Sequence, residues 1–538
     1  MNSHSASHTL REERLAPVKE LLGQESVQAT NSAMSFAQER LWFLEQLGLN
    51  GAVYNVPFAY RVIGELDLQA LERSFREIIR RHESLRTTFT IIDGKPRQVI
   101  SSDAPFAFEV IDLRQLPLHL RSLEAERQAA QEAKGSFDLG RGPLLRARIV
   151  RLDEREHLML MCVHHIAYDA WSHRVLMTEL AELYEAFAAG ERSSLPEPPA
   201  QYKDFARSQR ACLKAENFDK QLAYWRKQLS GSPATLELPS DRPRPAVQTF
   251  RGERHDFLLS RDLSKELKDL SRREGVTLFV TLLGAFQTLM YRYTRQEDIV
   301  IGSPVAQRNR REIENSIGLF VNTLALRTDL RGCPSFRELL KRVREVVMGA
   351  LMHQDMPFEK LVESLKPRRD VSRHPFIDVL FVLHSARPDT VNFGGLRLEQ
   401  VPINSGTAKF DLTVALTDLS DGSLSVEMEY SSDLFEASTI ERMCRHFETL
   451  LEAIVKDPSA RISDLPLLRE GERKGLLENF NDTQRVLPKE KIPELFERQV
   501  KKAPEATALV IGERCITYQE LNARANRLAH HLITLGIG

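Results

Sequence analysis

Two adjacent histidines followed by an aspartate are the strongest candidates for chemistry in this sequence: His164, His165 and Asp169. A neutral imidazole has an ordinary pKa near ~6.5, so it can accept a proton from an attacking amine or hydroxyl. The neighbouring histidine can hold a tight turn, and an aspartate four residues further on can orient that turn or pair with an arginine. Such an arrangement is suited to acyl transfer.

The same residues are compatible with other chemistry. A metal site would need more ligands and, for catalysis, an open coordination position, and no second cluster with matching spacing is evident. A pair of structural histidines at the end of a strand is the plainer alternative, and the spacing alone leaves it open. A serine hydrolase is disfavoured, because the chain has no Gly-x-Ser-x-Gly motif.

The elements around the double histidine are those that commonly present catalytic residues. Two β-like runs, residues 144–152 and 157–163, are joined by charged residues and predict a hairpin. The second run leads directly into His164. Apolar residues at helical spacing follow over 175–188, with a stop signal at Gly190. The histidines are therefore expected in a turn between a strand and a helix, where α/β proteins commonly place chemistry.

Composition limits the class of protein. The 538 residues exceed one ordinary core, and the net charge of -1 gives no general attraction to nucleic acid or to a membrane surface. No apolar run reaches the ~18 residues of a membrane span, and the first residues lack the apolar core of a secretory signal. Five scattered cysteines favour a reduced cytoplasmic protein over a disulfide framework or a zinc site.

Composition changes along the chain suggest its domains. Proline-rich stretches at 193–200 and 238–245 bracket a helical segment, where we expect the junction between two lobes. Helices at 278–293 and 335–353 mix with β-like runs without regular alternation, which favours an α/β class of two sandwich lobes over a barrel or a Rossmann sheet. The expected divisions are a tail or docking segment, an N-lobe, a C-lobe, a linker and a further domain, at 1–33, 34–205, 206–470, 471–485 and 486–538.

Seven segments together resemble the condensation domains of nonribosomal peptide synthetases. They occur in the order of that family and cover about residues 34–470. The segments are Ser35–Leu44, Arg81–Phe89, His164–Ser172, Tyr202–Ala206, Ile317–Thr323, His353–Glu359 and Arg369–Phe376.

This resemblance implies two lobes like chloramphenicol acetyltransferase in a V-shaped pseudo-dimer, with the active site in a tunnel between them. A donor acyl group and an acceptor aminoacyl group would enter from opposite sides, each on the phosphopantetheine arm of a carrier protein. The amine would attack the donor thioester. The implied partners are an upstream donor carrier, a downstream acceptor carrier and an adenylation domain in cis, with no intrinsic cofactor, no nucleic acid and no membrane. The chain is expected to be a monomer.

The resemblance also assigns roles to residues. His165 matches the catalytic histidine, with His164 holding the turn. Asp169 matches a residue that pairs with an arginine, for which Arg86 is our candidate. Trp171 and Ser172 are expected on the tunnel wall. Structural roles are expected for His82, His353, Asn322 and Asp355.

The sequence departs from the family at Ala170, where glycine is usual. Glycine permits backbone conformations and close approaches that alanine resists. The added methyl group is either a tolerated variation or a change that narrows access for substrate.

Three alternatives to peptide elongation stay open. A starter condensation domain would take a fatty acyl group from coenzyme A or an acyl carrier. A non-catalytic relative would recruit other enzymes to a carrier, although such relatives often lose the histidines. An epimerisation domain shares the motif but would not precede an adenylation domain, whose beginning the segment Ile516–Leu521 resembles.

Overall fold

The computed structural model describes residues 31–48, 51–102, 105–212, 216–233, 235–367, 370–384, 392–485 and 489–537. The expected tail or docking segment therefore lies outside the described residues up to residue 30, as does Arg369 of the seventh motif. The chain divides into two compact units, of which the first ends at Leu468 and the second comprises Arg469–Gly538.

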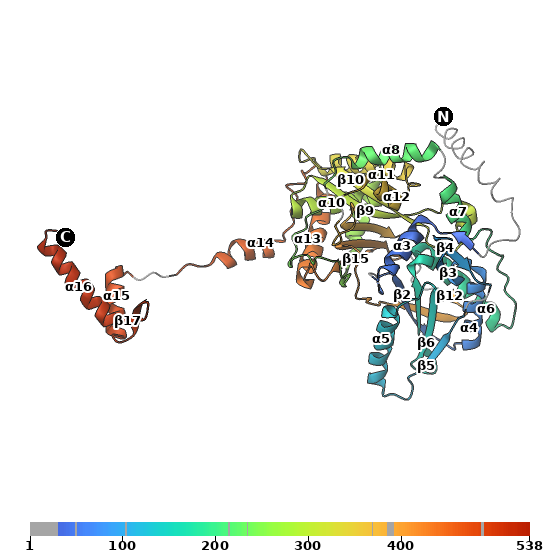
Figure 1. The fold of residues 1–538 in the computed structure, drawn as a ribbon, viewed down its shortest axis with the longest axis horizontal. Helices are drawn as coiled ribbons and strands as arrows, with labels where there is room; N and C mark the ends of the chain where they lie inside the picture. Colours follow the sequence, from blue (N-terminus) through green and yellow to red (C-terminus); the bar gives the residue numbers. More distant parts are fainter. Residues whose placement is uncertain are drawn as a thin grey trace. The chain divides into compact units, whose positions relative to one another are not determined.

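The first six-stranded sheet carries the double histidine at the end of an inner strand (Figure 1). The predicted hairpin is confirmed, since β6 (Leu145–Arg151) pairs antiparallel with β7 (Glu156–His164). Successive residues of β7 face different cores, Leu160 on one side and Met161 on the other, as the two-residue period of a strand requires. The sheet order is β12–β13–β2–β7–β6–β5, with β2 (Asn55–Ile63), β5 (Phe108–Asp112), β12 (Asn392–Phe393) and β13 (Leu396–Val401).

Helices cover both faces of this sheet. Helix α4 (Leu68–Arg81) is capped by Asp67, whose carboxylate accepts two backbone N–H groups at 2.9 and 3.0 Å. It packs beside α6 (Ala170–Ala188) in one core. Helix α5 (Leu118–Lys134) covers the opposite face. Helix α6 starts earlier than its apolar pattern predicts, because the side chain of Asp169 caps it.

A second six-stranded sheet, of order β10–β9–β11–β14–β15–β8, forms the other lobe. Strand β11 is parallel to β14, whereas β9–β10 and β14–β15 are antiparallel. This mixture confirms the expectation of two α/β sandwich lobes without regular alternation. Its strands are β8 (Gly252–Leu259), β9 (Asp298–Ala306), β10 (Val321–Asp329), β11 (Val379–His384), β14 (Leu412–Asp418) and β15 (Leu424–Ser431).

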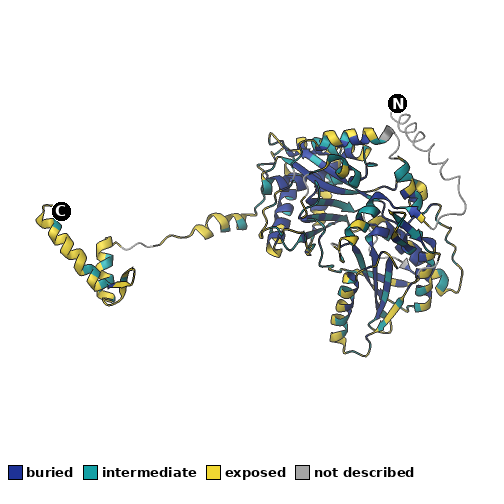
Figure 2. Cartoon of the chain, in the orientation of Figure 1, coloured by how far each residue is buried: buried dark blue, intermediate teal, exposed yellow. Residues whose placement is uncertain are grey.

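The second lobe also contains the two long helices that the sequence predicts. These are α10 (Leu278–Thr294), which is buried on nearly all sides, and α11 (Phe336–Met352), whose N-terminus has a capping box. Figure 2 shows the sheets of both lobes as largely buried and the outer sides of the helices as exposed. The remaining helices are α3 (Phe36–Gln46), α7 (Tyr202–Cys212), α8 (Glu216–Leu229), α9 (Arg261–Arg273), α12 (Phe358–Leu365) and α13 (Ala437–Lys456).

Part of the second half of the chain completes the first sheet. Strand β13 pairs antiparallel with β2, and the chain then crosses through residues 402–411 into β14 of the second sheet. No sequence pattern indicated this exchange. The lobe boundaries at 205/206 and 470 stay a prediction. Strands β12 and β13 follow the boundary at 205/206 in the sequence, yet they belong to the sheet of the N-terminal lobe.

The larger unit also contains a small three-stranded sheet, and the smaller unit has helices and strands of its own. In the expected further domain, residues 492–502 form a helix, which two strands and a final helix follow. The three-stranded sheet comprises β1 (Asn31–Ala33), β3 (Thr87–Ile92) and β4 (Lys95–Ile100). The smaller unit comprises α14 (Glu470–Leu477), α15 (Ile492–Lys502), β16 (Thr507–Ile511), β17 (Arg514–Thr517) and α16 (Tyr518–Thr534).

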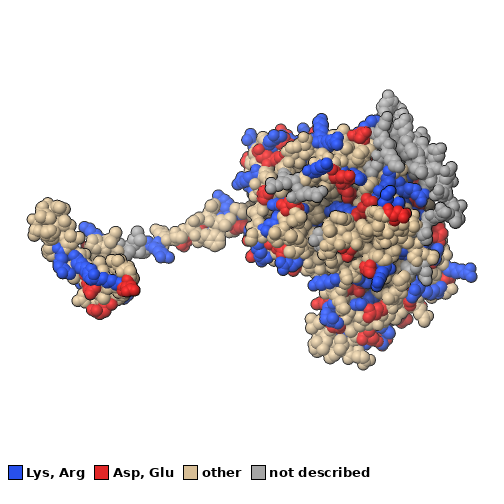
Figure 3. Space-filling model, viewed as in Figure 1, with Lys and Arg blue, Asp and Glu red and all other residues tan. Residues whose placement is uncertain are grey.

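The surface is mixed in charge. Figure 3 shows acidic and basic side chains interspersed over the visible face of the larger unit, in line with the net charge of -1. Among the described residues no single helix has the length and apolar character to cross a membrane, although α9 and α10, bent by 107°, meet that criterion as a pair.

Candidate active site

The double histidine lies on a tight turn that backbone hydrogen bonds hold in place. Strand β7 ends at His164, a short 3-10 turn covers His165–Ala167, and α6 follows. The N–H of His165 donates to the carbonyl oxygen of Tyr54 at 2.8 Å. The Nδ1 atom of His164 accepts the N–H of Ile166 at 3.2 Å, so His164 fixes the turn as predicted.

The ring of His165 is held in one tautomer. Its Nδ1 atom lies 2.5 Å from the carbonyl oxygen of Tyr168. A carbonyl oxygen can only accept, so Nδ1 carries the hydrogen and Nε2 presents a lone pair. Burial lowers the pKa of His165 to about 3, and the charge of Lys409 contributes in the same direction. The imidazole is therefore neutral at physiological pH.

Several cationic or titratable groups surround this ring. The Nζ atom of Lys409 lies 5.3 Å from the centre of the Tyr54 ring, which in turn lies 6.4 Å from the ring of His165. The guanidinium of Arg40 is 3.4 Å from Nδ1 of His374. The side chains of His165, Lys409 and His374 are only partly accessible to solvent.

Asp169 is the centre of a buried polar cluster. Its Oδ1 atom accepts the N–H of Ser172 at 2.8 Å and a guanidinium hydrogen of Arg308 at 3.1 Å. Its Oδ2 atom accepts the N–H of Phe320 at 2.9 Å. The carboxylate therefore caps α6 and also binds the chain that connects β9 to β10 in the second lobe.

The prediction that Arg86 pairs with Asp169 is wrong. The guanidinium of Arg86 donates to the carbonyl oxygens of Arg80 and Ser101 on its own lobe. Arg308 takes the predicted position instead, because it follows β9 and reaches across from the second lobe. Arg308 stands among further basic residues, Arg310 and Arg311, and nothing in that run of charge indicates that its side chain is buried, at 7% exposure.

The residues after Asp169 differ in their surroundings. The hydroxyl of Ser172 is fully buried, and its oxygen lies 2.7 Å from Oδ1 of Asp169 and 3.0 Å from the backbone nitrogen of Gly318. Ser172 therefore belongs to the polar cluster, and the expectation that it lines a tunnel wall is wrong. Trp171 is 36% exposed, and its Nε1 atom donates to the carbonyl oxygen of Glu314 at 2.9 Å. Ala170 is exposed and is the first residue of α6, where alanine requires no unusual backbone conformation.

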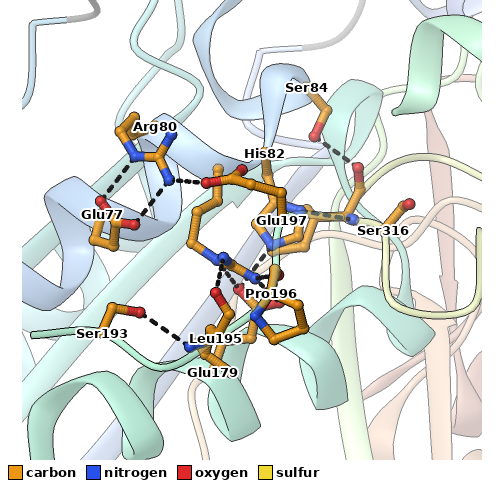
Figure 4. A network of polar contacts seen from close by, with 12 residues as sticks. Glu77, Arg80, His82, Ser84, Glu179, Ser193, Leu195, Pro196, Glu197 and Ser316 are labelled. Carbon is orange, nitrogen blue, oxygen red and sulfur yellow. Dashed lines mark hydrogen bonds and ion pairs between the residues drawn. The ribbon is translucent and has the colours of Figure 1, made fainter. Parts of the chain in front are cut away.

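His82 has the structural role that was predicted. Its Nδ1 atom accepts the N–H of Ile317 at 3.3 Å, so its Nε2 atom carries the hydrogen that it donates to Glu179 at 2.9 Å. Both Nε and Nη2 of Arg81 donate to the same carboxylate, at 3.0 and 3.1 Å (Figure 4). This network and the bond from Tyr202 Oη to the carbonyl oxygen of residue 319 hold the β9–β10 connection against the first lobe.

The other motifs also serve the architecture. The amide of Asn322 donates to the carbonyl oxygens of Gln354 and Met356, at 2.9 and 2.7 Å. The ring of His353 stacks on Tyr224 at 3.9 Å, as suits the structural role predicted for it. In the described part of the chain, no group of three or more His, Cys, Asp or Glu side chains could hold a metal ion.

Comparison with known proteins agrees with this fold. Residues 28–477 match the Condensation domain family, and residues 496–538 match the AMP-binding enzyme family. One protein of the linear gramicidin synthase of Brevibacillus parabrevis is 48% identical over 508 residues, which are 94% of this chain and 10% of that protein. A surfactin synthase protein of Bacillus subtilis is 40% identical over 508 residues, which are 94% of this chain and 14% of that protein.

Solved structures share the same architecture. The X-domain from teicoplanin biosynthesis superposes with a TM-score of 0.75 at 29% identity, covering 83% of this chain and 99% of the other. A four-domain nonribosomal peptide synthetase bound to AMP and glycine superposes with a TM-score of 0.83 at 22% identity, covering 96% of this chain and 40% of the other. The chain spans about a tenth of the length of the curated relatives it matches. It belongs to the condensation-domain family of nonribosomal peptide synthetases, and it continues into the start of an AMP-binding domain.

Proposed function

We propose that the larger unit forms an amide bond between an acyl or peptidyl thioester donor and the amine of an aminoacyl thioester acceptor. The observation that supports this most directly is the tautomer of His165. Because Nδ1 donates to the Tyr168 carbonyl, the lone pair on Nε2 is free to accept a hydrogen from an incoming amine.

The low pKa of His165 supports one order of proton transfers. An imidazole with a pKa of about 3 is a poor base toward an ammonium group. We therefore expect Nε2 to orient an amine that is already neutral. When nitrogen attacks the thioester carbon, it becomes cationic and strongly acidic, and its proton can pass through Nε2 to the departing sulfur. The carbon–nitrogen bond forms, the carbon–sulfur bond breaks, and an amide and a free thiol result.

The neighbouring residues would act through position. Asp169 and Arg308 hold the first turn of α6 against the β9–β10 connection, which keeps the histidine turn fixed between the lobes. We infer that Ala170 and Trp171, which are exposed at the start of that helix, contact substrate. We do not extend that role to Ser172 or Arg86, whose polar atoms are engaged within the protein.

The substrates would be presented by other domains. We propose that both acyl groups arrive on phosphopantetheine arms, the donor from an upstream carrier and the acceptor from a downstream one. The match of residues 496–538 to AMP-binding enzymes supports an adenylation domain in cis as the source of the activated acceptor. Peptide elongation is our preferred reaction, and fatty acylation of a first amino acid is the alternative.

A recruitment role is the second candidate, because one structural relative suggests it. The teicoplanin X-domain, 29% identical to this chain, has been solved in complex with OxyB. A domain used only for recruitment would not require the His165 tautomer or an open Nε2 atom. The intact turn favours catalysis here.

The test is the change His165→Ala, assayed with both carriers loaded and the product detected on the acceptor carrier by mass spectrometry. Loss of a positioned proton acceptor is expected to lower the rate by about 100-fold or more. His119→Ala, at an exposed position on α5, is the matched control and should leave the rate unchanged. A full rate in His165→Ala would contradict the proposal and favour recruitment.

The same assay separates elongation from starter acylation. The donor is supplied once on a carrier and once as a fatty acyl coenzyme A thioester. Product from the carrier donor alone supports elongation, whereas product from the coenzyme A thioester supports the starter reaction.

A further inference from the structure

The segment that crosses between the two sheets brings a lysine to the active site. After β13, residues 402–411 run to β14, and the backbone of this segment is held at two points. The N–H of Ala408 donates to the carbonyl oxygen of Phe250 at 2.9 Å, and the N–H of Gly252 donates to that of Gly406 at 3.1 Å. A Cβ atom on Gly252 would lie 2.4 Å from the nitrogen of Ala408, so the crossing passes in direct contact with this glycine.

The backbone of Lys409 is fixed as well, while its side chain reaches into the site. The Lys409 carbonyl oxygen accepts from Nε2 of His374 at 2.8 Å and from Nε2 of Gln248 at 3.0 Å. The Nζ atom faces the Tyr54 ring at 5.3 Å, and the backbone of Tyr54 holds His165. The strand exchange therefore delivers a cation to the neighbourhood of the histidine.

Charged and titratable groups face this region from several elements. Burial lowers the pKa of Lys409, and the charge of Arg40 on α3 acts in the same direction, whereas Glu429 of β15 opposes this shift. The charge of Lys409 in turn lowers the pKa of both His165 and His164. Among the described residues, no carboxylate lies within 4 Å of the Lys409 ammonium. From the remaining sides, Glu359 of α12 lies 3.7 Å from Arg40, and His374 adjoins Arg40 with a pKa that burial lowers to about 3.

A cation on the far side of the Tyr54 ring, whose charge acts on His165, has a consequence for the acceptor. An aminoacyl thioester carries an α-amine that is substantially protonated near neutral pH, and an ammonium group cannot attack a carbonyl carbon. Two cations, of Lys409 and Arg40, disfavour an ammonium group in this position. Glu359, 3.7 Å from Arg40, and Glu429, which acts on Lys409, partly offset this field.

We propose that Lys409 is an electrostatic positioning residue for condensation, whose ammonium group keeps the acceptor amine uncharged where it meets Nε2 of His165. This inference rests on the proposed function, because it requires an amine acceptor at His165. It adds a role for the crossing segment, which otherwise only joins the sheets.

The test compares the pH dependence of two variants. Lys409→Met keeps a stem of similar length without the charge, and Lys409→Arg keeps the charge. Without the cation, the bound amine and His165 are protonated more easily, so the acidic limb of the rate profile should move up by about one pH unit. The methionine variant should be about tenfold slower at pH 6.5 and should approach the wild-type rate above pH ~9. The arginine variant should keep the wild-type limb.

A second acceptor distinguishes this role from others. A carrier-bound aminooxy acid has a nitrogen of low basicity that is neutral throughout the assay range. With it, Lys409→Met should react as fast as the wild type, which also shows that the variant is folded. Equal losses with both acceptors would overturn the proposal, since stabilisation of the thioester oxygen or a folding defect would slow both. An unshifted acidic limb in Lys409→Met would overturn it as well.

Failure of the role of Lys409 can be distinguished from failure of the proposed function. If His165→Ala keeps full activity with both acceptors, the role of His165 fails. If His165→Ala is inactive while Lys409→Met has the wild-type pH profile, only the inference about Lys409 fails.

Discussion

A buried carboxylate is stable only where other groups replace the water it has lost, and Asp169 meets this condition with four donors. They are the N–H and hydroxyl of Ser172, the Arg308 guanidinium and the N–H of Phe320. The side chains of the ion pair are 4% and 1% exposed. Removing one member of such a pair leaves the other charge buried without compensation, which is far more costly than losing a surface pair.

We predict that Asp169→Ala lowers the free energy of unfolding of the larger unit by about 3–5 kcal/mol. Urea unfolding followed by tryptophan fluorescence measures this, since all three tryptophans of the chain lie in the larger unit. Asp112→Ala, which removes an exposed partner of Arg114 on the surface, is the control and should change stability little. An equal decrease in the free energy of unfolding in the two variants would show that the buried ion pair stabilises the protein no more than the surface pair does.

The sequence pointed to the candidate residues of the site but not to their partners. The spacing of His164, His165 and Asp169 predicted a turn between a strand and a helix, which the structure contains. Arg308 was missed because it is 139 positions from Asp169 and meets it only when the lobes pack together. Arg86 was predicted because it lies in one of the motifs, but a motif does not indicate which way a side chain points or which residue it contacts.

At the scale of elements, the crossing of the chain between the sheets depends on Gly252. At this position the Cβ atom of an alanine would lie 2.4 Å from the nitrogen of Ala408 and 2.5 Å from the carbonyl carbon of Thr407. Those are backbone atoms, so the crossing segment or β8 must move to make room.

We predict that Gly252→Ala destabilises the larger unit by about 1–3 kcal/mol, as overpacking does in well-packed interiors. It should also slow condensation, because the displaced segment carries Lys409. Gly471→Ala in α14 is the matched control, since its Cβ atom would meet nothing within 4 Å, and no loss is expected. Thermal unfolding and the carrier-loaded rate assay measure both effects. A wild-type melting temperature for Gly252→Ala would show that the close approach imposes no constraint.

Sequence patterns predicted some elements better than others, for physical reasons. Strand β7 and helix α10 were recognisable because burial on nearly all sides leaves continuous apolar runs. Strands β12 and β13 were not predicted, because their place in the first sheet depends on a contact with β2 more than 300 residues away. Periodicity reports which face of an element is buried, and it does not report against which partner.

At the scale of the whole molecule, seven ordered motifs predicted the two-lobed fold, and most of them turn out to hold elements together. The second, fourth and fifth motifs meet at the β9–β10 connection, through His82, Tyr202 and Ile317. Only the third contains the proposed catalytic histidine. Residues of several family motifs therefore make contacts that join the lobes. The proposed chemistry depends on the histidine turn of the third motif alone.

The buried histidines make the stability of the larger unit depend on pH. Burial lowers the pKa of His164, His165 and His374 to about 3 in each case. In the unfolded chain these groups titrate near ~6.5. Below that pH the unfolded state binds protons that the folded state does not, so stability is present above pH 6.5 and is lost as the pH falls toward 3. Asp378 opposes this trend, because burial raises its pKa to about 6 and the folded state takes up that proton first.

We predict that the free energy of unfolding decreases as the pH falls from 7 to 4.5. For His164, which is 3% exposed, the decrease is up to about 1.4 kcal/mol per pH unit. His165 and His374 are partly accessible and contribute less each. Urea unfolding at half-unit pH steps measures the slope. His164→Gln should reduce it by up to the contribution of one proton, and His119→Gln, at an exposed site, should leave it unchanged. A slope in His164→Gln equal to that of the wild type would mean that His164 takes up a proton in the folded protein as readily as in the unfolded chain, which would contradict the lowered pKa of this buried imidazole.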